Sequence, residues 1–481
     1  MHKIEFNAPE YHQDGSFKIT SYIFSGDEKS GWQIFRRGQP WLNLGPGYVP
    51  VKVLNCGVCA TDLARHQLPF ALPQITGHEV VGLYHDQCVA VEINASHKAT
   101  NDHVENCPYC RDGLEIHCPD RLTLGIDRLP GGFSPWVLAP VNAIRTLPTG
   151  MSAEAGVLIE PFAAALKAVE VTPPAAGAEV AVLGPRRLGM LIIVTLAGYR
   201  KQQQIDFTIT AVVRHSHMAE MCREAGADHV VIVNNQKPIK QQYDIVYDTT
   251  GKPEGFALAL QMSRHIVHLK STHGQTVQGL QYLTDMVINE QSIVSINHDN
   301  VIKEINELPG RKNIYLSSTV AEHIKQDLES SMSDVSCYQG DSQEMLECLS
   351  ENILGDKQAV IMRFDFAFVT RMQEIDHVLR LAQRMPGSIL KPTGKIVLLG
   401  SEYEAGESLL YSSIVERNIQ LQSSRCGDFS KAIEMLEGSP EIISWLQNNF
   451  ISHVIPLSDI QQAFSIAKDS SKSVKVVVKA D

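Results

Sequence analysis

Short apolar runs and helical segments alternate through the middle of the chain. The runs rich in β-branched and aromatic residues, which we predict to be buried strands, are residues 179–183, 208–213, 244–248 and 266–270. The helices predicted between them are residues 190–199, 218–225 and 253–262. Strands that alternate with helices in this way predict a parallel α/β sheet.

The first third of the chain has a different pattern. Short β-rich runs such as Val51–Leu54 and Asp86–Glu92 are separated by turn clusters, for example L-N-L-G-P-G-Y-V-P at residues 42–50. This part is therefore predicted to be mostly β, irregular and rich in loops. At 481 residues the chain is too long for one compact core, so two or three domains are expected.

Composition narrows the possible function classes. The net charge is −12 and 44% of residues are hydrophobic, which speaks against nucleic acid or a membrane as partner and for an ordinary globular protein. The amino-terminal residues have no apolar core of signal-peptide length, and the longest apolar runs, such as residues 190–197, are too short to span a bilayer. We therefore expect a cytoplasmic location. The ten cysteines are expected to be metal ligands and core residues rather than a disulfide framework.

The most informative stretch for chemistry lies between residues 54 and 82. Cys59, His78 and Glu79 offer a thiolate, an imidazole and a carboxylate, a ligand set that suits zinc. Three protein ligands leave one coordination position open, which distinguishes catalytic zinc from structural zinc. Each residue alone is more often an ordinary core or polar residue, so the prediction rests on the combination.

The motif G-V-C-A-T-D at residues 57–62, followed by G-H-E at residues 77–79, resembles the medium-chain, zinc-dependent alcohol dehydrogenases, and most closely their sorbitol, threonine and glucose dehydrogenase branch. The resemblance implies an α/β protein with a GroES-like, β-rich catalytic domain and a Rossmann domain with a doubly wound parallel sheet. The catalytic domain is expected over residues 1–170, completed by residues 440–481, and the Rossmann domain over residues 171–439.

The resemblance also implies roles for the motif residues. Cys59 and His78 would bind the catalytic zinc, and Glu79 would be a further ligand or a near neighbour. Thr61 would pass on the alcohol proton, and Asp62 would orient the ligands from behind.

Glu160 stands before Pro161 at the start of a predicted helix, where proline is well tolerated. The resemblance brings this glutamate to the zinc, directly or through water. Alternatively, its carboxylate only favours the helix N-terminus electrostatically.

A second metal site is predicted from three cysteines in the pattern C-x2-C-x7-C, namely Cys107, Cys110 and Cys118. Similar dehydrogenases carry a four-cysteine structural zinc, but the position of the remaining cysteine is Val104 here. His103 or His97 could supply the fourth ligand, because mixed cysteine and histidine sites are common. We predict a zinc with His103; the alternative is a lobe that has lost its metal and keeps three reduced thiols.

The strand at residues 179–183 leads into a loop that resembles a dinucleotide fingerprint, with glycine expected at its first, third and sixth positions. Gly184 and Gly189 occupy the first and last, but Arg186 stands in the middle. Arg186 would either obstruct the phosphates or, with Arg187, clamp them. The predicted cofactor contacts of this loop are Gly184, Arg186, Arg187, Leu188 and Gly189.

The residues after the second strand bear on the choice of dinucleotide. NAD enzymes place an acid there to bind the ribose hydroxyls, whereas this chain has Arg214. We therefore predict that NADP(H) is favoured over NAD(H), because Arg214 can bind a 2′-phosphate. The alternative is a solvated arginine at the start of a helix.

Residues 297–393 interrupt the family pattern and are predicted to be an α/β insertion. Its predicted strands are residues 313–317 and 359–363, and its predicted helices are residues 320–330 and 374–383.

The sequence flanking the insertion on one side, residues 266–293, echoes that on the other, residues 396–419, through either a partial internal duplication or chance. The resemblance implies a homo-oligomer, a dimer or a tetramer, whose sheets pair through the last strand. The insertion would then form an extra lobe or a new subunit contact.

Together these observations predict a zinc-dependent, NAD(P)-linked oxidoreductase that interconverts an alcohol or polyol and its carbonyl compound. The partner would be a small-molecule substrate. Two alternatives stay open: a catalytically silent, zinc-bearing binding or scaffold protein on the same fold, and a zinc-free reductase of the wider family.

Overall fold

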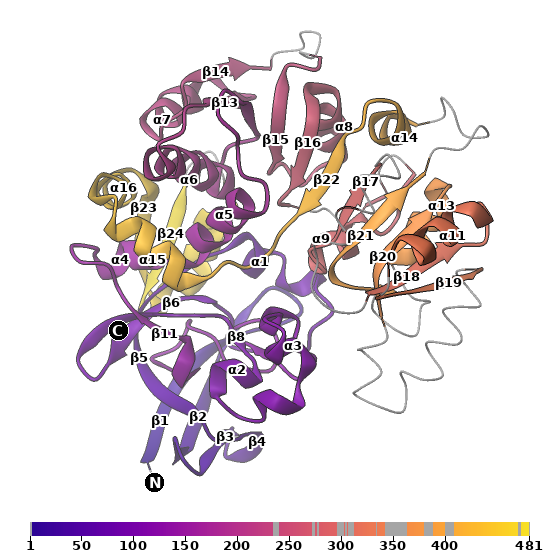
Figure 1. The fold of residues 1–481 in the computed structure, drawn as a ribbon. Coiled ribbons are helices and arrows are strands. Elements are labelled where there is room, and N and C mark those ends of the chain that lie inside the picture. Colours follow the sequence, from indigo (N-terminus) through magenta and orange to yellow (C-terminus); the bar gives the residue numbers. More distant parts are fainter. Residues whose placement is uncertain are drawn as a thin grey trace. The chain divides into compact units, whose positions relative to one another are not determined.

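The computed structural model of the protein (Figure 1) describes residues 2–233, 240–271, 275–276, 279–295, 303, 305, 312–332, 334–341, 363–379, 388–399, 408–469 and 473–480. It divides into two compact units, residues 1–164 with 426–481 and residues 165–425. The boundaries therefore differ from the expected 170/171 and 439/440. Helix α15 (Phe429–Glu437), for example, belongs to the first unit rather than to the Rossmann unit.

The first unit is β-rich, as predicted. A four-stranded antiparallel sheet is formed by β1 (His2–Tyr11), β2 (Phe17–Asp27), β3 (Gly31–Arg36) and β4 (Gln39–Leu44). A second sheet has the order β11-β7-β6-β5-β24-β23, and β10 also pairs with β5. Its strands are β5 (Tyr48–Gly57), β6 (Glu79–Tyr84), β7 (Gln87–Val91), β10 (Trp136–Pro140), β11 (Ile144–Thr146), β23 (Ile451–Pro456) and β24 (Lys475–Lys479). The pairing of β24 with β5 brings the end of the chain beside the strand that leads to Cys59.

One hydrophobic core joins the two sheets of this unit. The ring of Phe464 lies 5.8 Å from that of Tyr11 and 5.5 Å from that of Phe133, measured between centroids. The helices and short strands of the unit are α1 (Ala60–Leu63), α2 (His97–Thr100), α3 (Pro108–Arg111), α4 (Ala153–Gly156), α15, α16 (Pro440–Trp445), α17 (Ile460–Lys468), β8 (Asn94–Ala95) and β9 (Leu122–Thr123). The carboxyl-terminal segment, residues 426–481, thus belongs to the same compact unit as the amino-terminal part.

The second unit contains one eleven-stranded sheet with the order β14-β13-β12-β15-β16-β22-β17-β21-β20-β18-β19. Its first part consists of β12 (Glu179–Leu183), β13 (Thr208–Val213), β14 (His229–Ile232), β15 (Tyr243–Asp248), β16 (Ser263–Leu269) and β22 (Gln420–Ser423), all parallel. This order, with the first strand in the middle, is the Rossmann arrangement. The predicted parallel α/β sheet is confirmed, and β13 has the predicted bounds.

The insertion extends this sheet instead of forming a separate lobe, so that its strands continue the row beyond β22 (Figure 1). They are β18 (Lys312–Ser317), β19 (Val335–Gly340), β20 (Phe364–Val369) and the start of β21 (Leu390–Leu398), and they are joined to β22 through β17 (Ser292–Val294), which precedes the insertion. Of the strand predicted at residues 359–363, all but Arg363 lies outside the described residues.

The helices of the second unit are α6 (Arg187–Gln203), α7 (Ala219–Glu224), α8 (Pro253–Met262), α9 (Leu283–Ile288), α11 (Glu322–Ser331), α13 (Met372–Leu379) and α14 (Leu409–Tyr411); α5 (Ile159–Val171) begins in the first unit. The helix predicted at residues 253–262 has the bounds of α8. Within the described part of the chain, no helix combines the length and the apolar character that crossing a membrane requires.

Candidate functional site

Asp62 ties together the two segments that carry the candidate zinc ligands. Its Oδ2 accepts a hydrogen bond from the backbone N–H of Cys59 (2.9 Å), the residue that caps α1, and its Oδ1 accepts one from Gly77 (3.1 Å). The Asp62 side chain is buried. Hydrogen bonds to a buried carboxylate are strong, so one side chain fixes the segment of Cys59 relative to the segment of His78.

Cys59, His78 and Glu79 converge in the first unit. One potential ligand atom from each lies within 4.8 Å of the other two, with His78 and Glu79 buried and Cys59 half-buried. The buried Nδ1 of His78 makes no hydrogen bond to a described residue and lies 3.6 Å from Asp62 Oδ1. Burial disfavours a charged imidazole, but Asp62 and Cys59 outweigh it and raise the pKa of His78 well above its ordinary value. The cluster thus favours a positive charge, and its sulfur, nitrogen and oxygen donors fit zinc.

Two further residues predicted for this site, Thr61 and Glu160, differ in their contacts with the cluster. The hydroxyl of Thr61 lies 3.7 Å from the sulfur of Cys59. Glu160 lies in the first turn of α5, half-buried, and is not one of the three residues that converge. Its role as a ligand stays a prediction.

Glu79 has a partner that the sequence analysis missed. The ammonium group of Lys475, on β24, contacts the Oε2 of Glu79, and both side chains are buried. A Cβ on Gly57 would come within 2.0 Å of the Glu79 carboxylate and 2.9 Å of the Lys475 side chain. The pair therefore fills the space that the missing side chain leaves. The sequence carries no signal for this pair, because alternation places Lys475 and Lys479 of the same strand on one face and only the fold buries the first of them.

A second cluster joins His97 to Cys107, Cys110 and Cys118, whose ligand atoms also lie within 4.8 Å of one another. The sulfur of Cys118 lies 3.8 Å from that of Cys107 and 3.4 Å from His97 Nδ1. None of these three cysteines is in a disulfide. Three thiols and one imidazole are a complete ligand set for a structural zinc.

The structure corrects the predicted fourth ligand. The side chain of His103 is 68% exposed, and its Nε2 lies 3.4 Å from Asp102. His97 takes the fourth place instead, and its other ring nitrogen lies 3.8 Å from the carboxylate of Asp120. His97, the alternative named from the sequence, is the first residue of α2 and follows β8, and these two elements bring it to the three cysteines.

The thiols of this second cluster interact with one another. Hydrogen bonding from Cys118 lowers the pKa of Cys110 to about 5. A lowered pKa favours the thiolate, which is the form that binds metal.

The loop between β12 and α6 keeps the backbone shape that its two glycines allow. Gly184 has a φ of +73°, and a Cβ at Gly189 would lie 2.5 Å from the Thr249 hydroxyl. That hydroxyl donates to the carbonyl groups of Leu183 and Gly184 (3.0 Å each). The close packing of helix on strand, one function of the glycines in such loops, is therefore present.

The arginines of the predicted dinucleotide site lie at neighbouring strand ends. Arg186, after β12, is exposed and caps α6, and Arg214, directly after β13, is also exposed. Arg187 and Leu188 form the half-buried first turn of α6. Because β12 and β13 are adjacent and parallel, both exposed arginines belong to the carboxyl edge of the sheet, where dinucleotides bind in this fold.

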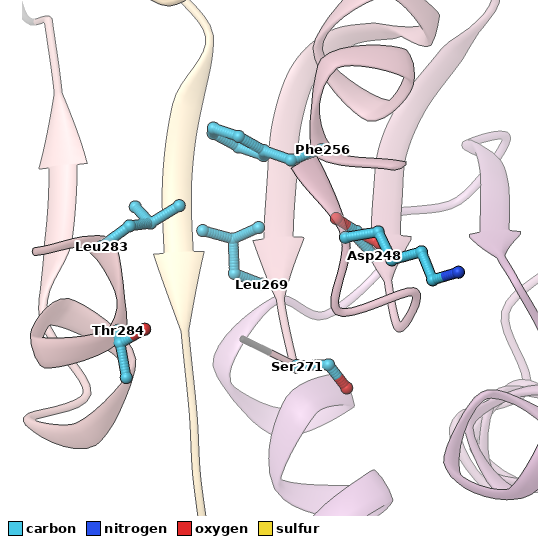
Figure 2. A pocket seen from close by; sticks show the side chains of 7 residues that line it. Asp248, Phe256, Leu269, Ser271, Leu283 and Thr284 are labelled. Atoms are coloured by element: carbon cyan, nitrogen blue, oxygen red, sulfur yellow. The ribbon is translucent and has the colours of Figure 1, made fainter. Parts of the chain in front are cut away.

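The same edge of the sheet carries a buried lysine and a small pocket. Lys270 donates to the carbonyl oxygens of Ser424 (3.1 Å) and Arg425 (2.6 Å), which follow β22. Figure 2 shows the pocket beside it, formed from β15, α8, the end of β16 and α9. The pocket is lined by Asp248, Lys252, Phe256, Leu269, Ser271, Leu283 and Thr284.

Comparisons with known proteins agree with this architecture. Residues 45–149 match the model of the alcohol dehydrogenase GroES-like domain. The chain is 26% identical over 238 residues to L-threonine 3-dehydrogenase of Sinorhizobium fredii, covering 47% of this chain and 64% of that one. It is 32% identical over 181 residues to L-galactonate-5-dehydrogenase of Escherichia coli, covering 35% of this chain and 51% of that one. The aligned part is thus between about half and two thirds of the length of these relatives.

The fold itself is shared with solved structures. A Sinorhizobium meliloti protein bound to NADP superposes with a TM-score of 0.53 over 99% of both chains, at 15% identity. A likeness at that identity concerns the fold alone. Taken with the domain match and the curated relatives, it shows that residues 45–149 carry an alcohol dehydrogenase GroES-like domain and that the chain has the fold of such dehydrogenases.

Proposed function

We propose that the protein is a zinc-dependent, NADP(H)-linked oxidoreductase that interconverts an alcohol or polyol and its carbonyl compound. The observation that carries this proposal is the convergence of Cys59, which is half-buried, with the buried His78 and Glu79 in the first unit. The matched relatives are named as dehydrogenases of threonine and galactonate, compounds that carry alcohol groups.

The residues of this cluster have separable tasks in the proposed reaction. Cys59 and His78 would hold the zinc, which would act on the substrate oxygen as a Lewis acid. Thr61, whose hydroxyl is 3.7 Å from the Cys59 sulfur, would accept the proton of the alcohol. Asp62 would keep the two ligand segments in register. Glu79 would add negative charge to the cluster, and Lys475 would balance part of it.

The second unit would bind the dinucleotide. Arg214 would bind a 2′-phosphate and Arg186 a bridging phosphate, because a guanidinium group matches phosphate oxygens in geometry and charge. The structurally similar Sinorhizobium meliloti protein has NADP bound, which supports this choice of cofactor. A second zinc would be held by His97, Cys107, Cys110 and Cys118.

A catalytically silent, zinc-bearing scaffold is the second candidate. The observation that favours it is Arg186, which stands where a glycine normally lets the pyrophosphate approach the backbone.

One experiment separates the two candidates. Purified protein is analysed for metal by mass spectrometry and titrated with NADPH and with NADH by fluorescence. A panel of alcohols and polyols is then tested with NADP⁺ by absorbance. Two zinc ions per chain, tighter binding of NADPH and turnover of an alcohol would support the oxidoreductase. Cys59→Ser should lose turnover and one zinc but keep dinucleotide binding. Zinc without binding of either dinucleotide would refute the oxidoreductase and leave the scaffold.

A further inference from the structure

We infer that the insertion is a degenerate internal copy of the dinucleotide-binding sheet, joined to the first copy by an exchange of last strands. The first evidence is strand order. Four strands of the first copy lie in the order β13-β12-β15-β16, and four strands of the second lie in the order β19-β18-β20-β21. In the first copy β12, the first of the four along the chain, lies between β13 and β15, and in the second copy β18 lies in the same way between β19 and β20. All neighbouring strands within each copy are parallel. The two copies therefore share one topology.

An equivalent aspartate makes the same contact in each copy. In the first, Asp244 of β15 accepts a hydrogen bond from the backbone N–H of Glu179 at the start of β12 (2.8 Å). In the second, Asp365 of β20 accepts one from Asn313 at the start of β18 (2.8 Å). The strand registers align these residues. The pairing of β12 with β15 begins at Val180 and Ile245, one residue after the contact of Glu179 with Asp244. The pairing of β18 with β20 begins at Ile314 and Phe366, one residue after the contact of Asn313 with Asp365.

The next strand of each copy supplies a cation to the same aspartate. Arg264 of β16 lies 3.4 Å from Asp244, and Lys391 of β21 lies 2.8 Å from Asp365. Both are the second residue of their strand. The pairing of β15 with β16 and that of β20 with β21 each shift register beside the aspartate. Chance similarity of apolar rhythm does not reproduce such polar detail, so these contacts favour duplication.

The last strand of each copy lies on the other copy. Along the chain, β16 leads through α9 to β17, but β17 pairs with β21. Likewise β21 leads through α14 to β22, but β22 pairs with β16.

The two exchanged strands meet antiparallel at Ile293 and Leu421. These residues are themselves equivalent, since Leu421 pairs with Val267 and Ile293 with Ile396 at matching positions. A twofold relation requires equivalent residues to face one another, and here both copies belong to one chain.

The second copy has lost the features of a dinucleotide loop. The aligned registers place Ser318 and His323 where the first copy has Gly184 and Gly189. Glycines at these positions allow the tight turn and the close helix packing of a phosphate-binding loop.

A carboxylate also occupies the strand ends of the second copy. Glu374 accepts hydrogen bonds from Ser317, from the Thr319 hydroxyl (3.0 Å) and from the backbone N–H groups of Thr370 (2.9 Å) and Arg371 (3.0 Å). A carboxylate placed there repels phosphate and takes the donors that phosphate would use. The second copy therefore has a structural task, as the permanent partner of the first.

In this arrangement the insertion lies, along the chain, between two neighbouring strands of the dinucleotide half. The carbonyl groups that Lys270 binds follow β22, and β22 reaches β16 only after the chain has passed through the second copy. The surface that pairs the two copies is used inside one chain and needs no second molecule.

A pair of introduced cysteines tests the exchange independently of any activity. Directly opposed residues of antiparallel strands have Cα atoms about 4.5–5.5 Å apart, within the range of a disulfide. Ile293→Cys with Leu421→Cys should therefore oxidise to an internal disulfide, seen as linked peptides in a species of one chain, 53.2 kDa. Val267→Cys with Ile396→Cys is the matched control. Those equivalent residues lie three strands apart, about 14 Å, and should not link.

Covalent dimers would show that the strands pair between two chains, and absence of a link in folded protein would show that they are not neighbours. Either result overturns the inference. If the first pair does not fold, Ser292→Cys with Gln422→Cys follows the same antiparallel register at less apolar positions. The absence of a dinucleotide site from the second copy is tested by titration with NADPH. Two molecules of NADPH bound per chain would overturn this part of the inference. One per chain agrees with it, and none would count against the proposed function alone.

Discussion

The ammonium group of Lys475 contacts the carboxylate of Glu79 in the interior of the first unit, where the two side chains are 4% and 1% exposed. Removing one partner of such a pair leaves an uncompensated buried charge and costs about 3–5 kcal/mol. Glu79 also belongs to the candidate zinc cluster. The carboxylate of Glu79 is therefore shared between Lys475 and the proposed zinc. Either cation would balance part of its negative charge when the other is absent.

Lys475→Met should destabilise the metal-free protein by about 3–5 kcal/mol and the zinc-loaded protein by clearly less, because zinc would supply the missing positive charge. Thermal unfolding with a chelator and with added zinc measures both values. Lys479→Met is the matched control, since Lys479 lies on the same strand but is exposed. An equal loss with and without zinc would show that Glu79 does not face the metal.

The second metal cluster predicts a difference between two histidines. His97→Ala should lower the zinc content from two ions per chain to one, because it removes one of four ligands from a closed site. His103→Ala should retain both ions, since its side chain is exposed and away from the thiols. Metal analysis after gel filtration gives the counts. Loss of zinc from the His103 variant alone would restore the original assignment.

Much of the fold was predictable because it depends on local pattern. The apolar run of β13 and the Pro-initiated helix α8 are both visible in the sequence without knowledge of their neighbours. Cys59 and His78 were recognisable because the resemblance is carried by short motifs. Each of these features is contained within a few consecutive residues.

The features that were missed depend on contacts between distant segments. Lys475 reaches Glu79 by the pairing of β24 with β5, and β22 reaches β16 by strand exchange. The choice between His97 and His103, both named from the sequence, likewise depends on how β8 and α2 bring His97 to the thiols. Sequence reasoning noticed the echo across the insertion but could not distinguish duplication from chance. The contacts of Asp244 and Asp365 that separate the two exist only in the folded sheet.

Arg214 predicts the selectivity for dinucleotide. Arg214→Ser should weaken NADPH binding about tenfold or more, equivalent to about 1.4 kcal/mol, because a charge-assisted contact to the 2′-phosphate is lost. NADH lacks that phosphate, so its affinity should hardly change. Fluorescence titration of both dinucleotides measures the ratio. Arg223→Ser on α7, an exposed arginine paired with Glu220, is the control, and equal weakening of NADPH and NADH by the Arg214 variant would contradict the assignment.

Asp248, at the carboxyl end of β15, predicts a pH dependence of stability. Burial raises the pKa of Asp248 from 3.8 to about 6, against hydrogen bonds from Thr250 that act in the opposite direction. In the unfolded chain the carboxyl ionises near its ordinary pKa, so between about pH 4 and pH 6 the native state binds more protons than the unfolded state. The contribution of the Asp248 carboxyl to the free energy of unfolding is therefore fully present below about pH 4. This contribution, about 3 kcal/mol, is lost as the pH rises through about 6.

Asp248→Asn mimics the protonated form and keeps an oxygen that can accept from Thr250. The variant should match the natural protein near pH 4 and exceed it in stability at pH 7.5, and urea unfolding at both pH values measures the difference. Asp14 is the control with the opposite sign, because hydrogen bonds from Ser16 lower its pKa and Asp14→Asn should therefore gain nothing at pH 7.5. A natural protein that becomes more stable than the Asp248 variant as pH rises would show that this carboxylate has a cation partner in solution and is charged in the native state.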